Sequence, residues 1–192
     1  MNTEYSWEKR FLSSKWKIYR NYRPVGFIKA PFFSRNATAE IDYEKYEFRG
    51  SKWMSLDKTE IVNAKDDVIG RVKNIMDEDD NLDNNIAYSI QINEETSFIE
   101  IPSLKNMQTW YIKNPAGVNI TYKSTSWHDY RGEITTNKNN KIELLLGLYI
   151  LPVYSRLTVA ILVGIVALIA IFVIPGAIAF IWQLLRKLFL GF

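Results

Sequence analysis

The chain has 192 residues, of which 47% are hydrophobic and 23% are charged, and its formal net charge is +3. This composition is typical of a folded chain and excludes wholesale disorder. The absence of cysteine excludes a disulfide scaffold, a thiolate zinc site, an iron–sulfur cluster and a cysteine nucleophile.

The N-terminal region is basic and aromatic. Residues 1–36 contain eight Lys or Arg and two Glu, whereas residues 37–110 contain 8 basic and 16 acidic residues. We treat residues 1–13 as a segment that precedes the first domain. Cations of this region could contact anionic lipid headgroups. The residues that we expect to do so are Lys9, Arg10, Lys15, Arg20 and Arg23. The alternative is a solvated face on which opposite charges neutralise one another.

Residues 14–155 have the pattern of a β domain. Residues 37–48, for example, alternate outward charge with inward bulk, and turn residues separate such runs. A weak threefold repeat is visible, because Ser14-Lys15-Trp16 recurs as Ser51-Lys52-Trp53 and Thr109-Trp110 opens a third unit. Two hairpins in each unit predict about twelve short strands.

A second pattern returns inside these units. Val25-Gly26-Phe27-Ile28-Lys29 in the first unit corresponds to Ile69-Gly70-Arg71-Val72-Lys73 in the second. Each follows an apolar strand and a turn. The two glycines mark positions where we expect a β-bulge or a close approach of neighbouring backbones.

These hairpins and the apolar closing segment resemble the Tubby-like superfamily, which also contains the LURP-one-related proteins and the phospholipid scramblases. The resemblance covers roughly residues 16–154. It implies a closed or near-closed antiparallel barrel around a hydrophobic helix from the C-terminal end, and a function at lipids. The segment 142–151, which is apolar nearly throughout, stands where that helix is expected, and it is equally compatible with a last strand.

The C-terminal part of the chain is a candidate membrane segment. Residues from Leu157 to Leu185 form a run of 29 uncharged residues, and a membrane span needs about 20. We predict a transmembrane helix over 157–174, a break at Pro175, and a continuation or an interfacial amphipathic segment over 175–192. The expected interfacial anchors are Arg156, Trp182, Arg186 and Lys187. The alternative is a hydrophobic helix buried in a barrel or in an oligomer.

Catalytic, cofactor and metal sites are not expected. His128 is the only histidine, and strand alternation places its neighbours in the sequence on opposite faces. A weak calcium candidate consists of oxygens at alternate positions: Asp77, Asp79, Asn81 and Asp83. Leu82 replaces the glycine of a calcium loop, and Tyr88 replaces its last glutamate, so a solvated loop is the alternative.

The sequence therefore predicts a mainly β, membrane-anchored, non-enzymatic domain that associates with lipid. We expect a single-pass, tail-anchored protein whose N-terminal domain is cytoplasmic, because no apolar run follows a basic start. The expected partners are a lipid bilayer, anionic lipids in particular, and no nucleic acid. The alternative is an accessory or assembly subunit of a larger membrane protein complex, and lipid scrambling is the runner-up to simple association with lipid.

Overall fold

The computed structural model describes residues 3–10, 13–52, 55–75, 86–101, 109–125, 131–137, 140–173, 176, 180–183 and 185–186. It divides into two compact units, Met1–Val153 and Tyr154–Phe192. His128 and the calcium candidate Asp77, Asp79, Asn81 and Asp83 lie outside the described residues.

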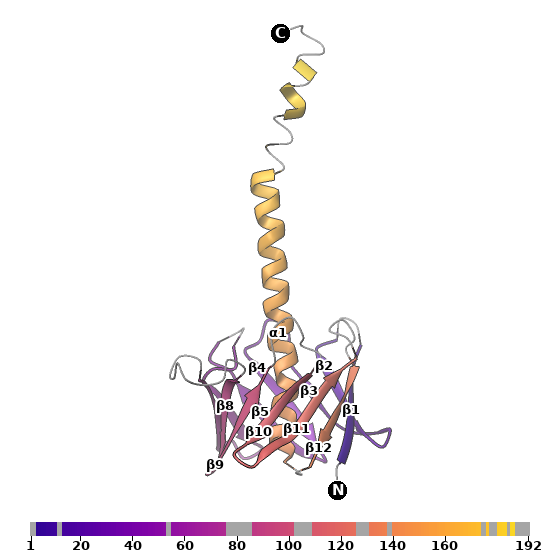
Figure 1. The fold of residues 1–192 in the computed structure, drawn as a ribbon, viewed down its shortest axis with the longest axis vertical. Coiled ribbons are helices and arrows are strands. Elements are labelled where there is room, and N and C mark those ends of the chain that lie inside the picture. Colours follow the sequence, from indigo (N-terminus) through magenta and orange to yellow (C-terminus); the bar gives the residue numbers. More distant parts are fainter. Residues whose placement is uncertain are drawn as a thin grey trace. The chain divides into compact units, whose positions relative to one another are not determined.

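The first unit is a closed antiparallel barrel of twelve strands, which confirms that part of the predicted fold (Figure 1). Each strand pairs with its neighbours in the sequence, and the pairing of the first strand with the last closes the ring. The strands are β1 (Thr3–Lys9), β2 (Lys15–Arg20), β3 (Arg23–Lys29), β4 (Asn36–Ile41), β5 (Glu44–Arg49), β6 (Thr59–Asn63), β7 (Val68–Asn74), β8 (Ile86–Ile92), β9 (Glu95–Glu100), β10 (Thr109–Asn114), β11 (Gly117–Ser124) and β12 (Arg131–Thr136). Strand β1 lies within the segment 1–13 that the sequence analysis set apart.

The internal repeat corresponds to three bulged hairpins. The register shifts after Ile18 between β2 and β3, after Ile61 between β6 and β7, and after Ile112 between β10 and β11. Ile18 pairs with Gly26, and Ile61 pairs with Gly70. Because a bulge bends its strand and increases the local twist, three equivalent bulges help to close the sheet.

Gly26 permits the close backbone approach that the sequence predicted. A Cβ atom at this position would overlap the main-chain carbonyl oxygen of Glu40 on β4. At Gly70 the corresponding atom would lie 2.7 Å from the carbonyl oxygen of Gln91 and 3.0 Å from the side chain of Ile61.

We expect Gly26→Ala to lower the free energy of unfolding by about 2 kcal/mol, because the methyl group meets main chain that cannot rotate away. Gly70→Ala is expected to cost about half as much, since the approach there is less close and partly to a flexible side chain. Urea unfolding followed by circular dichroism measures both values. A larger loss at Gly70 than at Gly26 would contradict this account.

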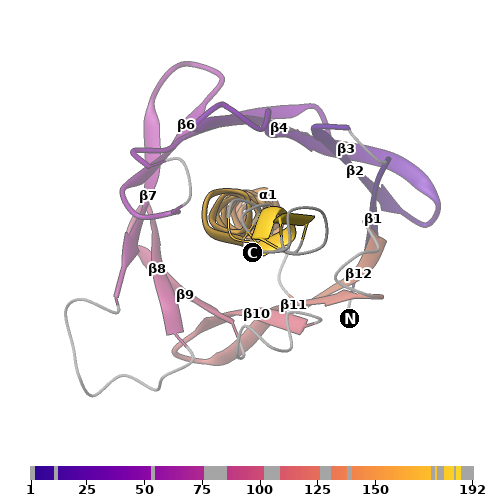
Figure 2. The same cartoon turned by 90° about the horizontal axis from the view of Figure 1, so that it is seen from above.

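The helix α1 (Lys141–Leu168) begins inside the barrel, and the strands form a ring around its first residues (Figure 2). Its first residues, through Val153, belong to the first unit and are almost all buried, including Leu145, Leu146 and Tyr149. The segment 142–151 is therefore a core helix and not a strand. Asn140 caps it, because its side-chain oxygen accepts a hydrogen bond from the backbone NH of Glu143 at 3.2 Å.

An aromatic cluster on β1, β10 and β11 holds this helix in the lumen. The Trp110 indole NH donates to the carbonyl oxygen of Gly147 at 2.9 Å. The Tyr122 hydroxyl donates to the carbonyls of Glu143 and Leu144, both at 3.0 Å. The rings of Trp110 and Tyr122 are stacked with centroids 5.1 Å apart. Burial raises the pKa of Tyr122 well above its usual value, so the hydroxyl stays protonated and remains a donor.

The barrel has two different ends, which we call the hairpin rim and the loop rim. The hairpin rim carries the tight turns 21–22, 42–43 and 93–94 and the start of α1, where Lys141 Nζ lies 2.6 Å from Glu44. The loop rim carries the longer connections 10–14, 30–35 and 50–58. Tyr149, two turns along α1, donates to the carbonyl oxygen of Arg35 at this rim at 2.9 Å.

The prediction of a transmembrane helix over 157–174, in the second unit, is wrong. Among the described residues, no helix combines the length and the apolar character that crossing a membrane requires. The α-helical backbone ends at Leu168, and the wider π-helix Ile169–Val173 follows. The α-helical part of the predicted segment, Leu157 to Leu168, is therefore well short of about 20 residues.

Candidate functional site

The structure distributes the five predicted headgroup cations over both ends of the barrel. Lys9, Arg10 and Lys15 lie at the loop rim, whereas Arg20 and Arg23 flank the tight turn at the hairpin rim. They do not form one surface, because the full length of β2 separates the two groups.

Two of these cations are already engaged within the barrel wall. Lys9 is half-buried with its Nζ 4.5 Å from the centre of the Trp16 ring, and burial lowers its pKa. Arg20 donates a hydrogen bond to the Tyr5 hydroxyl and lies 3.1 Å from Asp42, and first the hydrogen bond and then the carboxylate raise the pKa of Arg20. Arg10 and Arg23 are exposed.

A lysine patch, formed by Lys15, Lys17 and Lys29, lies on the outer face of β2 and β3. Lys15 and Lys29 are directly opposite each other across the two strands. Like charges in such a pair repel and destabilise a sheet. Among the described residues, none of the three lysines forms an ion pair, and the ammonium of Lys15 lies over the Phe27 ring at 3.7 Å.

The sequence analysis missed Lys17 and Lys29. Lys17 could have been found from the alternation Lys15-Trp16-Lys17-Ile18, which places Lys15 and Lys17 on one face of a strand. Lys29 joins them only through the register of β2 with β3.

The connection after Lys29, a member of the lysine patch, presents an exposed aromatic residue. A turn, in which the NH of Ser34 donates to the carbonyl of Pro31 at 3.1 Å, shapes the connection. Phe33 is 89% exposed, and its ring is nearly perpendicular to the ring of Phe32, with the two centroids 5.0 Å apart. An exposed ring at the same rim as lysines that form no ion pair among the described residues suits the boundary between headgroups and acyl chains.

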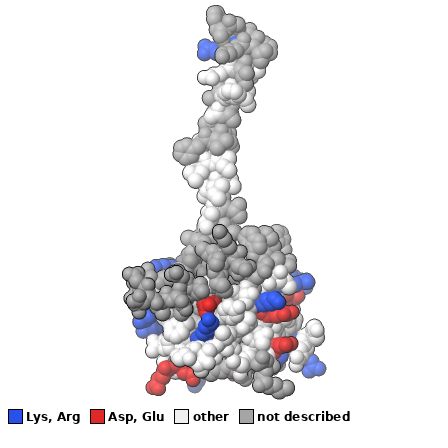
Figure 3. Space-filling view, viewed as in Figure 1, with Lys and Arg blue, Asp and Glu red and all other residues white. Residues whose placement is uncertain are grey.

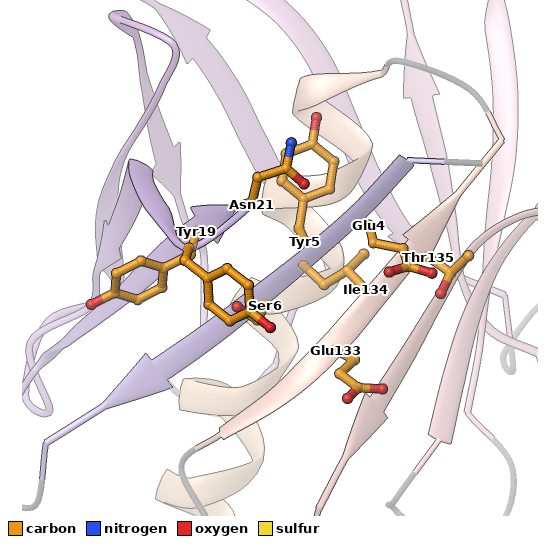
Figure 4. Close-up of a pocket in the computed structure, with 9 residues that line it drawn as sticks. Glu4, Tyr5, Ser6, Tyr19, Asn21, Glu133, Ile134 and Thr135 are labelled. Atoms are coloured by element: carbon orange, nitrogen blue, oxygen red, sulfur yellow. The ribbon is translucent and has the colours of Figure 1, made fainter. Parts of the chain in front are cut away.

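A separate pocket of about 290 Å³ lies on the outer face of β1, β2 and β12 near the hairpin rim (Figure 4). Ser6 forms its floor, since Tyr19 is its neighbour on β2 and Glu133 its neighbour on β12. Glu4 and Thr135, which pair with each other, continue the wall, as the close-up shows. The small serine between two larger side chains explains the depression.

Tyr19 and Tyr22 give this pocket an aromatic side. The Tyr19 hydroxyl donates to Glu8 at 2.6 Å, which fixes the ring and raises the pKa of Tyr19. Tyr22 is 99% exposed at the turn between β2 and β3. Its φ of 61° and the φ of 52° at Asn21 are the left-handed values that a tight hairpin turn requires.

The predicted anchors in the second unit are only partly described. Trp182 and Arg186 are exposed. Lys187 and the side chain of Arg156 lie outside the described residues. The described surface of this unit is almost entirely uncharged, drawn white in Figure 3, and its bare side chains include Val163, Val166 and Ile171.

Comparison with known proteins finds a similar solved structure but no family. No family model matches the chain, and no curated protein does. A crystal structure of a protein from Arabidopsis thaliana is similar with a TM-score of 0.49 and 9% sequence identity, covering 79% of this chain and 89% of that one. The architecture implied by the sequence resemblance, a closed barrel of twelve strands around a helix from the C-terminal end, is present in the structure.

Proposed function

We propose that the protein is a non-enzymatic β-barrel module of Tubby-like architecture that associates with lipid. In this proposal the loop rim faces an anionic lipid surface. The observation that carries it is the facing pair Lys15 and Lys29, which keep their like charges side by side without a carboxylate partner among the described residues. Such a pair is stabilised when an anion lies against it.

An exposed apolar group at the loop rim supports the same orientation of the barrel. Each lysine near an anionic leaflet contributes about 1 kcal/mol of attraction, and the exposed ring of Phe33 adds apolar contact at the headgroup boundary. Anionic lipids give the cytoplasmic leaflet its negative potential, so the proposal places the barrel on the cytoplasmic side.

Vesicle flotation of the full-length chain tests the proposal. With vesicles of mixed phosphatidylcholine and phosphatidylserine, we expect Lys15→Gln/Lys29→Gln to weaken binding about 30-fold, because two lysines are lost at about 1 kcal/mol each. Raising the ionic strength is expected to weaken binding of the wild-type chain, since salt screens exposed charges.

The matched control is Lys45→Gln/Lys65→Gln, which removes two exposed lysines at the hairpin rim and changes the net charge equally. We expect this control to bind the mixed vesicles almost as the wild type does. Equal losses in the two double variants, or equal binding of the wild type to vesicles of phosphatidylcholine alone, would rule out headgroup recognition by the lysine patch.

A second candidate function is that of an accessory or assembly subunit of a larger membrane protein complex. The pocket at Ser6 favours it, because that pocket lies near the hairpin rim and shares no residue with the lysine patch. The two functions are compatible, since one module can contact lipid at one rim and a protein at the other.

A further inference from the structure

The pocket at Ser6 has the chemistry of a site for an organic cation. Glu4 and Glu133 line it as exposed carboxylates, and among the described residues neither forms an ion pair or a hydrogen bond. Lys123 lies opposite Glu133 on β11 without forming an ion pair with it. Lys17, another cation on this outer face, is opposite Glu8.

The aromatic lining selects among cations. Tyr19 and Tyr22 offer ring faces that attract a positive charge and pack against an apolar stem. A small, strongly hydrated metal ion gains little from aromatic rings and needs several oxygen ligands. The described residues contain no group of three or more potential metal-ligating carboxylates or histidines. An alkylammonium or guanidinium group satisfies both the carboxylates and the rings.

The volume and the charge of the pocket indicate where that cation comes from. About 290 Å³ is at the lower end of ligand pockets, which suits one long side chain. A choline or ethanolamine headgroup brings a phosphate close to its ammonium, and Glu4 and Glu133 would repel this phosphate. A lysine or arginine side chain enters without an attached anion.

We propose that this pocket binds a lysine or arginine side chain presented by a protein partner. Ser6 provides the floor, Glu4 and Glu133 neutralise the charge, and Tyr19, held by Glu8, packs against the apolar stem. Tyr22, whose φ is positive at the turn, adds a second ring to the lining. This site is independent of lipid binding, because it shares no residue with the lysine patch.

Saturation-transfer NMR with the full-length chain tests the proposal. The probes are capped pentapeptides Gly-Ser-X-Ser-Gly in which X is arginine, lysine or norleucine, together with glycerophosphocholine. We expect the arginine and lysine peptides to bind and the norleucine peptide and glycerophosphocholine not to bind. Glu4→Gln/Glu133→Gln is expected to weaken peptide binding about tenfold, and Tyr22→Ser about threefold.

Two further variants separate a pocket from general surface charge. Glu40→Gln/Glu94→Gln removes two carboxylates that do not line the pocket, and we expect it to leave peptide binding unchanged. Ser6→Leu fills the floor but keeps all charges, and we expect it to abolish binding. Unchanged binding in Ser6→Leu, equal losses in the two carboxylate variants, or preferential binding of glycerophosphocholine would each overturn the proposal. Circular dichroism confirms that each variant is folded.

Discussion

Trp110→Ala is expected to lower the free energy of unfolding of the barrel by about 4 kcal/mol. Truncation of a buried tryptophan removes a large apolar contact area and leaves a cavity, which together cost about 3–5 kcal/mol. Trp110 is 2% exposed, and its ring contacts Tyr122 and Trp7, with centroids 5.1 and 5.7 Å away. Its loss also removes the hydrogen bond from the indole to the carbonyl of Gly147. Urea unfolding followed by circular dichroism measures the effect.

Two other tryptophan variants serve as controls for Trp110→Ala. Trp182→Ala removes a tryptophan that is 68% exposed in the second unit, and we expect it to leave the stability of the barrel unchanged. Trp110→Phe keeps a ring in the cluster but loses the indole NH, so we expect an intermediate loss of about 2 kcal/mol. If Trp110→Ala and Trp182→Ala had similar effects, Trp110 would not anchor the central helix.

Gly147→Ala is the second change with a large expected effect, a loss of about 3 kcal/mol. A Cβ atom at this position would overlap the ring and hydroxyl of Tyr122, which is fully buried. Overpacking costs about 1–3 kcal/mol, and displacing the hydroxyl from its two carbonyl partners adds about 1–3 more. The better helix propensity of alanine returns about 1 kcal/mol.

Gly164→Ala is the matched control, because Gly164 lies in the same helix and nothing lies within 4 Å of the added methyl group. We expect this variant to retain the full stability of the barrel. The double variant Gly147→Ala/Tyr122→Phe is expected to be less destabilised than the sum of its single variants, since the hydroxyl that the methyl group would displace is already absent. Strict additivity would show that the two positions do not press on each other.

The threefold repeat predicted the number of strands, because all three units meet the same backbone requirement. Each unit needs an apolar strand, a bulge and, in two units, a glycine where a neighbouring backbone comes close, and these constraints leave the pattern seen around Gly26 and Gly70. The apolar segment 142–151 was open to two interpretations, because a buried helix and a buried strand have the same composition. The hydrogen bonds from Trp110 and Tyr122 to its carbonyls could not be read from the order of residues.

The candidate sites were less predictable, since each depends on strand register. Lys15 and Lys29 are fourteen positions apart in the sequence and become opposite each other only through the pairing of β2 with β3. The pocket at Ser6 combines residues from both ends of the barrel sequence, such as Glu4 and Glu133. The transmembrane prediction failed for a different reason, because hydrophobicity alone does not reveal where α-helical backbone gives way to a π-helix.

The enclosure of α1 by the barrel has a consequence for the order of events during synthesis on the ribosome. Strand β12 completes the ring with β1, and the core-filling part of α1 emerges only after all twelve strands. Until α1 has been synthesised, the apolar inner face of the nascent sheet lacks the helix side chains that cover it in the native barrel. Exposed apolar surface of this kind makes a nascent chain prone to aggregation. The sheet must then wrap around a segment that emerges after all of its strands, so acquisition of the native state is expected to be a late step that a chaperone would assist.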